Sequence, residues 1–277
     1  MWEKLPPLKE TIANYNLSAD KSLGQHFLLD RNFLKKIIRA SPSLKNQNVL
    51  EIGPGPGGLT RTILEENPAQ LIAVEKDQRC IKALSETLLP ISDSVLRLHS
   101  ADALKCDYTE ICPPQTHVVA NLPYNIGTAL LIKWLHTPNH FASITVMLQK
   151  EVAERIVAKP NQNAYGRLAL FCQWLCDVEF CFEVPARLFV PPPRVVSAVI
   201  KLTPLAVPRY HAKRETLEKL TQTVFSARRK MLRSSLKSIC ADPQKLLLQC
   251  NIDPEARPET ISLEAFCLLA RNLDMAA

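Results

Sequence analysis

The tetrapeptide Asn121-Leu122-Pro123-Tyr124 contains the residue types that most directly indicate chemistry. An amino group on an aromatic ring is a poor nucleophile, because its lone pair is delocalised into the ring. The Asn121 side-chain carbonyl and a carbonyl of the turn can accept the N–H bonds of such an amine, which frees the lone pair. Pro123 fixes the turn, and Tyr124 can stack on a base. We interpret Asn121 and Tyr124 as candidate catalytic residues for methylation of a planar amine; the alternative is a turn with a core tyrosine.

A glycine-rich loop precedes this tetrapeptide in the chain. Four of the seven glycines occupy six positions: Gly53, Gly55, Gly57 and Gly58. An ordinary turn between a strand and a helix needs one glycine, whereas a backbone that a ligand must approach closely needs several. The spacing of Gly53, Gly55 and Gly58 also fits a dinucleotide-binding loop. The loop therefore predicts a nucleotide-like ligand without identifying it.

Three acidic residues favour one ligand over the others. Glu51 lies inside an apolar strand, where an unpaired charge is costly, so a cationic ligand such as S-adenosylmethionine would account for it. Glu75 ends the next predicted strand and can accept hydrogen bonds from both ribose hydroxyls. Asp102 can accept from an adenine amino group, and the N–H of Ala103 can serve a ring nitrogen. Asp102 is equally plausible as a helix N-cap.

Periodicity predicts the elements that position these residues. Apolar runs rich in Val and Ile alternate with helical stretches, which is typical of a parallel sheet covered on both faces. The predicted strands are Asn48–Gly53, Gln70–Glu75, Ser94–His99, Thr116–Asn121 and Ser143–Leu148. The predicted helices between and after them are Leu59–Glu66, Gln78–Leu89, Gly127–Leu135 and Lys150–Ala158. Two later runs, Val178–Val184 and Val195–Leu202, are expected to add an antiparallel edge.

Prolines and a change of pattern divide the chain. Residues 1–30 are expected to form an arm that leads into a helix capped by Asp30. Residues 31–204 are expected to form the α/β domain. The segment 203–208 contains two prolines and is expected to be a linker. Beyond it we expect a small all-helical domain over 209–277, which begins with a long helix, Thr216–Ile239.

The chain has 277 residues and a net charge of +7, and the basic excess is local. Residues 201–240 carry a net charge of +8, and the rest of the chain carries −1. On the predicted helix, Arg229, Arg233 and Lys237 recur at spacings of four and Lys230 extends their surface, with no acid between 220 and 238. We expect these four residues to bind RNA phosphates, although a solvated charged face is the more ordinary interpretation.

Composition restricts the class of protein. The hydrophobic fraction of 47% and the charged fraction of 22% are those of a soluble globular chain. No apolar run is long enough for a membrane span, and the first residues do not form a secretory signal. The nine cysteines are scattered without a CxxC pair, which favours reduced thiols in the cytoplasm over disulfides or a metal site. We expect no metal and no membrane partner.

Several segments together resemble the bacterial 16S ribosomal RNA adenine dimethyltransferase family over about residues 15–275. The segments that carry the resemblance are 23–28, 51–60, 121–125, 147–155, 165–168, 189–195 and 225–232. The resemblance implies a Rossmann-like class I methyltransferase sheet with helices on both faces and a helical C-terminal domain. It also implies S-adenosylmethionine-dependent N6,N6-dimethylation of two adjacent adenosines in the 3′-terminal hairpin loop of 16S rRNA.

The same resemblance implies partners and cofactor contacts. The RNA would be recognised within a 30S precursor during small-subunit maturation, and we expect a monomer. The family's cofactor contacts carry over to His26, Leu28, Gly53, Glu75, Asp102 and Asn121. One departure is the segment 160–163, where the family often has Pro-Gly-Ser-Lys and this chain has Pro-Asn-Gln-Asn. This difference loses a cation and a flexible residue in a loop expected to face RNA.

Three alternatives remain open at this point. The same chemistry can act on large-subunit rRNA or on DNA, although the segment 225–232 disfavours both. A ribosome assembly factor without turnover would keep the cofactor pocket. An NAD-dependent oxidoreductase would match the glycine loop and leave Tyr124 and the basic residues without a role.

Overall fold

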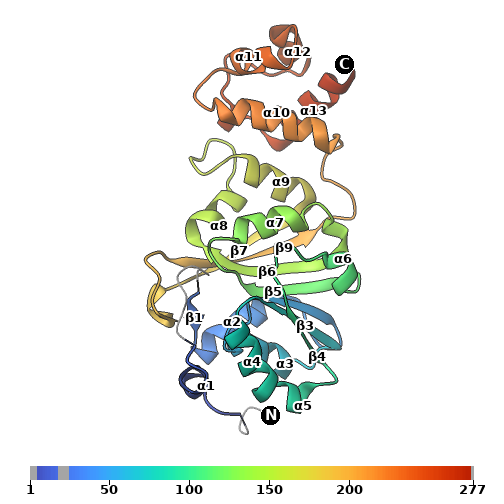
Figure 1. Ribbon diagram of the computed structural model, residues 1–277. Coiled ribbons are helices and arrows are strands. Elements are labelled where there is room, and N and C mark those ends of the chain that lie inside the picture. The colour runs from blue at the N-terminus through green and yellow to red at the C-terminus, as the bar shows by residue number, and fades with distance from the viewer. Residues whose placement is uncertain (1–4, 18–24, 276–277) are drawn as a thin grey trace. The chain divides into compact units, whose positions relative to one another are not determined.

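The structure is a computed structural model that describes residues 5–17 and 25–275. The chain forms two compact units (Figure 1). The N-terminal unit combines Met1–Ala153 with Glu179–Pro204, and the C-terminal unit combines Glu154–Val178 with Leu205–Ala277. Leu23 and Gly24, at the start of the first segment that carries the family resemblance, lie outside the described residues.

A seven-stranded sheet is the centre of the N-terminal unit. The strands are β2 (Asn48–Ile52), β3 (Gln70–Glu75), β4 (Leu96–Ser100), β5 (Thr116–Asn121), β6 (Phe141–Gln149), β7 (Cys176–Val184) and β9 (Ser197–Pro204). Their order is β4-β3-β2-β5-β6-β9-β7. The strands from β2 to β6 are parallel, and β9 runs antiparallel to β6. The predicted parallel sheet and its antiparallel addition are therefore confirmed.

Register brings the candidate residues to one edge of this sheet. Glu51 on β2 is opposite Ala73 on β3, and Glu75 at the end of β3 is opposite Ser100 on β4. Asn121 ends β5 on the other side of β2. Because parallel strands end at the same edge, the turns that follow them lie close together, and the reversal of strand order beside β2 leaves a crevice there.

Helices cover both faces of the sheet, as right-handed crossovers require (Figure 1). The N-terminal unit contains α1 (Leu8–Asn14), α2 (Arg31–Ala40), α3 (Gly58–Glu65), α4 (Gln78–Thr87), α5 (Leu89–Ser92), α6 (Tyr108–Ile111) and α7 (Gly127–Trp134), with single-turn helices η3 (Pro138–His140) and η4 (Ala186–Leu188). Helix α2 begins where expected, because the Asp30 carboxylate accepts a hydrogen bond from the Phe33 N–H at 3.0 Å.

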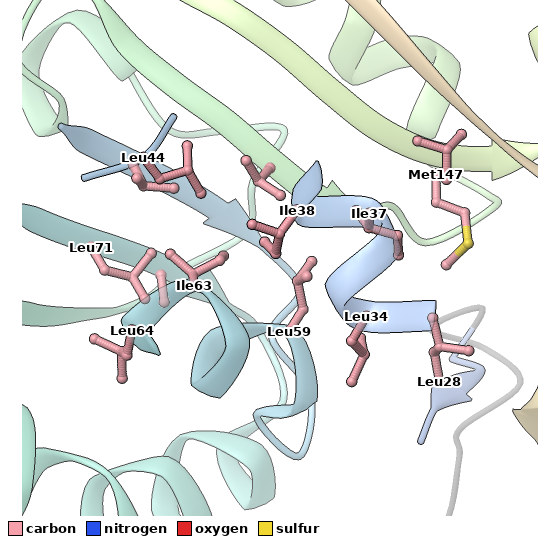
Figure 2. Packing of buried hydrophobic residues seen from close by; sticks show 14 of the residues in the cluster. Leu28, Leu34, Ile37, Ile38, Leu44, Leu59, Ile63, Leu64, Leu71 and Met147 are labelled. Atoms are coloured by element: carbon pink, nitrogen blue, oxygen red, sulfur yellow. The ribbon is translucent and has the colours of Figure 1, made fainter. Parts of the chain in front are cut away.

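The core between helices and sheet is aliphatic. Figure 2 shows part of the cluster in which α2 and α3 supply Leu34, Ile37, Leu59 and Ile63, all of them nearly or completely buried. Burial of one such side chain contributes about 1.5–3 kcal/mol of transfer free energy. Leu28 also belongs to this cluster, so the core reaches the segment that precedes α2.

A separate two-stranded sheet connects distant segments within the N-terminal unit. Strand β1 (Phe27–Leu28) pairs antiparallel with β8 (Phe189–Val190). Phe27 lies opposite Val190, and Leu28 lies opposite Phe189. The arm therefore has a fixed position where it approaches the carboxyl edge of the large sheet. The sequence predicted an arm here and gave no indication of this pairing.

The C-terminal unit is helical. Its helices are α9 (Arg167–Leu175), α10 (Arg214–Ser226), α11 (Leu232–Ser235), α12 (Pro243–Gln249) and α13 (Leu263–Met275), with single turns η5 (Leu236–Ser238) and η6 (Pro258–Thr260). Helix α8 (Lys150–Val157) begins in the N-terminal unit and ends in the C-terminal unit, and strand β7 begins in the C-terminal unit and continues in the N-terminal unit. Helices α10 and α13 pack against each other, with Leu217, Leu220 and Phe266 buried.

The C-terminal unit includes residues 154–178, which the sequence analysis placed in the first domain. The Tyr165 hydroxyl donates a hydrogen bond to the Ile261 carbonyl at 2.9 Å, and Tyr165 is 2% exposed. The Leu205 N–H donates to the Leu175 carbonyl at 2.9 Å. These contacts join segments that are far apart in sequence. Domain boundaries predicted from prolines and changes of pattern along the chain do not reveal such contacts.

The prediction of one helix over Thr216–Ile239 is wrong. Helix α10 ends at Ser226, and the chain turns through 227–231 before α11 begins. The reason is tertiary: the Leu232 N–H donates to the Ala256 carbonyl at 2.8 Å, and the Arg233 N–H donates to the Pro254 carbonyl at 3.2 Å. Donors used in this way do not make the hydrogen bonds of a continuous helix.

Candidate active site

A cavity of about 300 Å³ opens at the carboxyl edge of the large sheet. Of the ten residues predicted as catalytic or cofactor-binding, nine line it: His26, Leu28, Glu51, Gly53, Gly55, Glu75, Asp102, Asn121 and Tyr124. Ala103 does not line it, and its neighbour Leu104 does. The lining comes from β1 and from the turns that follow four parallel strands, which is where open α/β sheets bind ligands.

The glycine loop forms one wall of the cavity and needs glycine for its conformation. Gly53 has φ +67° and Gly57 has φ +88°. A Cβ on Gly57 would lie 2.8 Å from a methyl carbon of Leu84, so a side chain there would also clash. The Gly53 N–H donates to the Val74 carbonyl at 2.9 Å, which ties the loop to β3.

Glu51 is a buried carboxylic acid at the end of the cavity near the loop. It is 1% exposed, and its Oε2 accepts no hydrogen bond from the part of the chain that the structure describes. Burial raises the pKa of Glu51 to about 8, against a smaller opposing effect of Thr60. An acidic group in this state is compensated when a cation lies against it.

Glu75 is buried and accepts three main-chain hydrogen bonds. Its carboxylate takes the N–H of Gly55 at 3.1 Å, that of Lys76 at 2.7 Å and that of Asp77 at 2.8 Å. Burial raises the pKa of this carboxyl, and the three N–H donors oppose that rise. Glu75 therefore connects the glycine loop to the start of α4, and it keeps lone pairs for a ligand hydroxyl.

Asp102 follows β4 and forms an ion pair across the mouth of the cavity. Its carboxylate accepts from the Lys76 ammonium at 3.0 Å and from the Leu104 N–H at 3.0 Å. Because these donors hydrogen-bond the charged form, the pKa of Asp102 lies below its ordinary value. Asp102 does not begin a regular helix, so its interpretation as a helix N-cap is wrong. Lys76, which the sequence analysis did not single out, lines the cavity.

A hydrogen bond to the N-terminal arm holds the side chain of Asn121 in place. Its amide nitrogen donates to the His26 carbonyl at 3.3 Å, which determines the orientation of the amide group. Within residues 5–17 and 25–275, its side-chain oxygen accepts no hydrogen bond and is available to a ligand. A neutral acceptor fixed beside a cavity suits an N–H donor on a substrate.

Tyr124 lies beside Asn121 and is fixed at two points. Its hydroxyl is hydrogen-bonded to the Ser197 hydroxyl at 2.5 Å. Its ring lies 5.4 Å from the His26 ring, with the planes tilted by 33°. Burial raises the pKa of Tyr124, so the phenol stays protonated.

The arm closes one side of the cavity. His26 Nδ1 lies 2.8 Å from the Pro191 carbonyl, and because a carbonyl only accepts, Nδ1 carries the proton. Gln25 donates to the Asp77 carboxylate at 3.1 Å. His26 and Leu28, predicted from the resemblance, thus reach the cavity through the pairing of β1 with β8.

The four predicted RNA-binding residues lie in the C-terminal unit but not on one helix. Arg229 and Lys230 are exposed in the turn after α10, Arg233 is on α11 and Lys237 is on η5. Arg233 pairs with Glu255 at 2.9 Å. For Arg229, Lys230 and Lys237, no ion pair to another described residue is present. The expected arrangement on one helical face is therefore wrong, although Arg229, Lys230 and Lys237 are exposed and Arg233 is partly exposed.

The cysteines do not contribute to the site, and the described residues contain neither a metal-binding cluster nor a helix that could span a membrane. All nine cysteines are free, and burial raises the pKa of Cys172 and Cys176 far above the ordinary range. The described residues contain no group of His, Cys, Asp or Glu that could hold a metal ion. In the same part of the chain, no helix combines the length and apolar composition needed to cross a lipid bilayer.

Comparison with known proteins gives a consistent result. The family model described as "Ribosomal RNA adenine dimethylase" matches residues 16–274. A protein of Cereibacter sphaeroides named "Ribosomal RNA small subunit methyltransferase A" is 49% identical over 271 residues, which is 97% of each chain. A protein of Ruegeria pomeroyi with the same name is 48% identical over 274 residues, 98% of each chain.

Two solved structures resemble the fold. A dimethyladenosine transferase from Plasmodium falciparum aligns with a TM-score of 0.78 and 26% identity, covering 90% of this chain and 98% of the other. The 23S rRNA methyltransferase ErmE aligns with a TM-score of 0.68 and 27% identity, covering 90% and 99%. The fold is thus the class I methyltransferase fold that the sequence predicted. With a family match over nearly the whole chain, this protein belongs to the ribosomal RNA adenine dimethylase family and is an rRNA methyltransferase.

Proposed function

We propose that the protein uses S-adenosylmethionine to dimethylate N6 of two adjacent adenosines in the 3′-terminal hairpin loop of 16S rRNA, within a 30S precursor. One observation carries the proposal: the fixed amide acceptor of Asn121 and the aromatic ring of Tyr124 both line the cavity. The names of the bacterial relatives support the small subunit as the source of the RNA. We further propose that the protein acts as a monomer in the cytoplasm.

The residues of the cavity fit the proposed cofactor. Glu51 presents a buried oxygen without a hydrogen-bond donor, and the ammonium of S-adenosylmethionine would supply the missing cation. Glu75 would accept from the ribose hydroxyls, and Asp102 from the adenine amino group. When bound, the cofactor would supply an electrophilic methyl group bonded to its positively charged sulfur, which would keep the electron pair of the broken C–S bond and leave as a neutral thioether.

The chain's own residues would prepare the nucleophile. The Asn121 oxygen accepts an N–H of the adenine amino group, holds the nitrogen in place and reduces its conjugation with the ring. Tyr124 stacks on the flipped base, a contact worth about 1–3 kcal/mol. Both residues are neutral, so their contribution is positioning rather than proton abstraction, and the amine proton leaves to solvent after transfer.

An oxidoreductase that binds NAD fits the cavity less well. The dinucleotide pyrophosphate would lie at the glycine loop, near the buried acid Glu51. Because burial raises the pKa of Glu51 to about 8, a phosphate beside it would hold it in the neutral form and gain no attraction, whereas a cation would favour the ionised form and be attracted to it. Calorimetric titration with S-adenosylmethionine and with NAD separates the two ligands directly.

The proposal is tested by methyl transfer from labelled S-adenosylmethionine to 30S particles that lack this modification, with the products mapped by mass spectrometry. Two dimethylated adenosines in the 3′-terminal hairpin loop are expected. Naked 16S rRNA, already modified 30S particles and 50S particles serve as controls. Transfer to 50S particles alone would move the substrate to the large subunit. Cofactor binding without transfer to any particle would favour an assembly factor without turnover.

A further inference from the structure

The hydroxyl of Tyr124 is bonded to a residue on a strand that carries no other candidate site residue. Ser197 is the first residue of β9 and is completely buried. It lies opposite Gln149 in the antiparallel pairing of β9 with β6, and the neighbouring Val196 carbonyl accepts from the Lys150 N–H at 2.9 Å. The strand pairing therefore fixes the position of Ser197 Oγ relative to the carboxyl edge of the sheet.

Tyr124 itself lies in a turn and not in a strand. Its side chain is half-buried and lines the cavity. Both groups are protonated hydroxyls, so either one can donate to the other. Without the Ser197 hydroxyl, the phenol would lose its only hydrogen-bond partner among the described residues. The ring would then be free to move from the position in which it can meet a base.

We propose that Ser197 is a positioning residue, which holds the Tyr124 ring at the angle required to stack on the target adenine. The proposal rests on the proposed function, because it assumes that Tyr124 receives a base. It makes the tyrosine hydroxyl an anchor and assigns it no part in proton transfer. The aromatic ring performs the recognition, and the strand β9 determines where that ring lies.

The test compares Ser197→Ala, Tyr124→Phe and the double variant, since each single change removes the same hydrogen bond. Loss of a hydrogen bond of about 1 kcal/mol corresponds to roughly a fivefold lower kcat. Each single variant should show this decrease, with S-adenosylmethionine affinity by calorimetry within about twofold of wild type. The double variant should be no slower than either single variant. Ser197→Thr, which keeps a hydroxyl, should recover activity.

Ser143 offers a matched control on the same sheet. It is also completely buried, it lies near the start of β6, and its hydroxyl is bonded to His117 at 2.8 Å. Ser143→Ala should leave kcat unchanged in any preparation that thermal melting shows to be folded. This control distinguishes the effect of removing any buried serine hydroxyl from the effect of removing the hydrogen-bond partner of Tyr124.

A second readout does not depend on turnover. An RNA hairpin with 2-aminopurine at the target position becomes more fluorescent when that base leaves its stack, and a stacked tyrosine quenches it. Ser197→Ala and Tyr124→Phe should change this signal equally, and Ser143→Ala should not change it. Additive losses in the double variant, unchanged kcat in Ser197→Ala or a parallel loss of cofactor affinity would overturn the proposal. Failure of the proposed function would appear in wild type itself, as absence of adenine dimethylation.

Discussion

The side-chain amide of Asn121 donates its hydrogen bond to the main-chain carbonyl of His26, at 3.3 Å. His26 precedes β1, whereas Asn121 ends β5, so a residue of the arm determines the orientation of the candidate catalytic amide. Because the acceptor is a main-chain carbonyl, the orientation of the Asn121 amide depends on the path of the arm backbone and not on the ring of His26. The pairing of β1 with β8 keeps the arm in that course.

Replacement of Asn121 should therefore affect transfer much more than cofactor binding. Asn121→Ala removes the acceptor for the adenine N–H, and we expect kcat to fall by about 10²–10³-fold, as when one fixed hydrogen-bonding group is removed from a reaction centre. Cofactor affinity by calorimetry should change by no more than about threefold. Asn121→Asp keeps an acceptor but loses the donor to His26, so its oxygens should lose their fixed orientation and its activity should also fall.

Single-turnover rates and calorimetric affinities on the same preparations distinguish this role from a structural one. Equal losses of cofactor affinity and of rate in Asn121→Ala would assign Asn121 to the shape of the cavity. His26→Ala provides a useful comparison. It keeps the main-chain carbonyl and so should preserve the orientation of Asn121 better than Asn121→Asp does.

Glu51 should make cofactor affinity depend on pH. Its pKa is raised to about 8 by burial, so at pH 7 most of the free protein carries a neutral acid. A cation binds the ionised form, and the affinity of wild type should rise by up to about tenfold from about pH 7 to above pH 8 relative to Glu51→Gln, since one pKa unit equals 1.36 kcal/mol. The ratio of the two affinities removes the cofactor's own titration. A ratio independent of pH would contradict the assignment of Glu51 to the cation.

The same shift predicts how the stability of the free protein changes between about pH 4.5 and pH 8. The pKa of Glu51 is raised above its ordinary value of 4.5, so the folded state binds the proton more tightly than the unfolded state. Its contribution to stability is complete below about pH 4.5 and is lost as the pH rises through about 8. Urea unfolding of the free protein should show this loss in wild type and not in Glu51→Gln.

The sequence predicted the site through the strands that end beside it. The runs that became β2, β3, β5 and β6 are apolar and buried along most of their length, and a parallel sheet places their carboxyl ends together whatever the details of packing. Glu51, Glu75 and Asn121 were therefore located by order along the chain alone. Ala103 does not line the cavity and its neighbour Leu104 does, so the role expected for the main-chain N–H of Ala103 stays a prediction.

Long-range contacts could not be predicted in the same way. Ser197 meets Tyr124 only through the register of β9 on β6, and His26 meets Asn121 only through the pairing of β1 with β8. The break after α10 has the same origin, since its hydrogen bonds go to residues 254–256. In the segment 160–163, Asn161 has φ +71°, a conformation that asparagine tolerates better than most residues, so the replacement of glycine there keeps the turn.

Glu75 should be important for cofactor binding and for stability at once. Glu75→Ala removes the proposed ribose acceptor and leaves the N–H groups of Gly55, Lys76 and Asp77 without their carboxylate. Loss of one acceptor for buried donors costs about 1–3 kcal/mol, so urea unfolding should show a destabilised protein. Calorimetry should show a large loss of cofactor affinity, while RNA affinity measured without cofactor stays near wild type. An RNA affinity that falls before the cofactor affinity would contradict the ribose assignment.

The cations in the turn after α10 should contribute more to RNA binding than Arg233 on α11 does. Arg229 and Lys230 are exposed, whereas Arg233 pairs with Glu255. Each phosphate contact adds roughly 0.7–0.9 to the slope of log affinity against log salt concentration. Arg229→Ala with Lys230→Ala should therefore reduce the slope by about one to two, and Arg233→Ala should reduce it less, because its ion pair already screens that charge.

Lys45 is the control for this prediction. It is exposed and lies just before β2, at the amino edge of the sheet and opposite the edge that holds the cavity. Lys45→Ala removes one positive charge, half of what the double variant removes, and should leave the salt dependence of binding to a 16S hairpin RNA unchanged. If the Arg229 and Lys230 double variant keeps the wild-type slope, or if Lys45→Ala lowers it equally, the turn after α10 is not an RNA-binding surface. The basic excess of the C-terminal unit would then affect only the general attraction of the protein to polyanions.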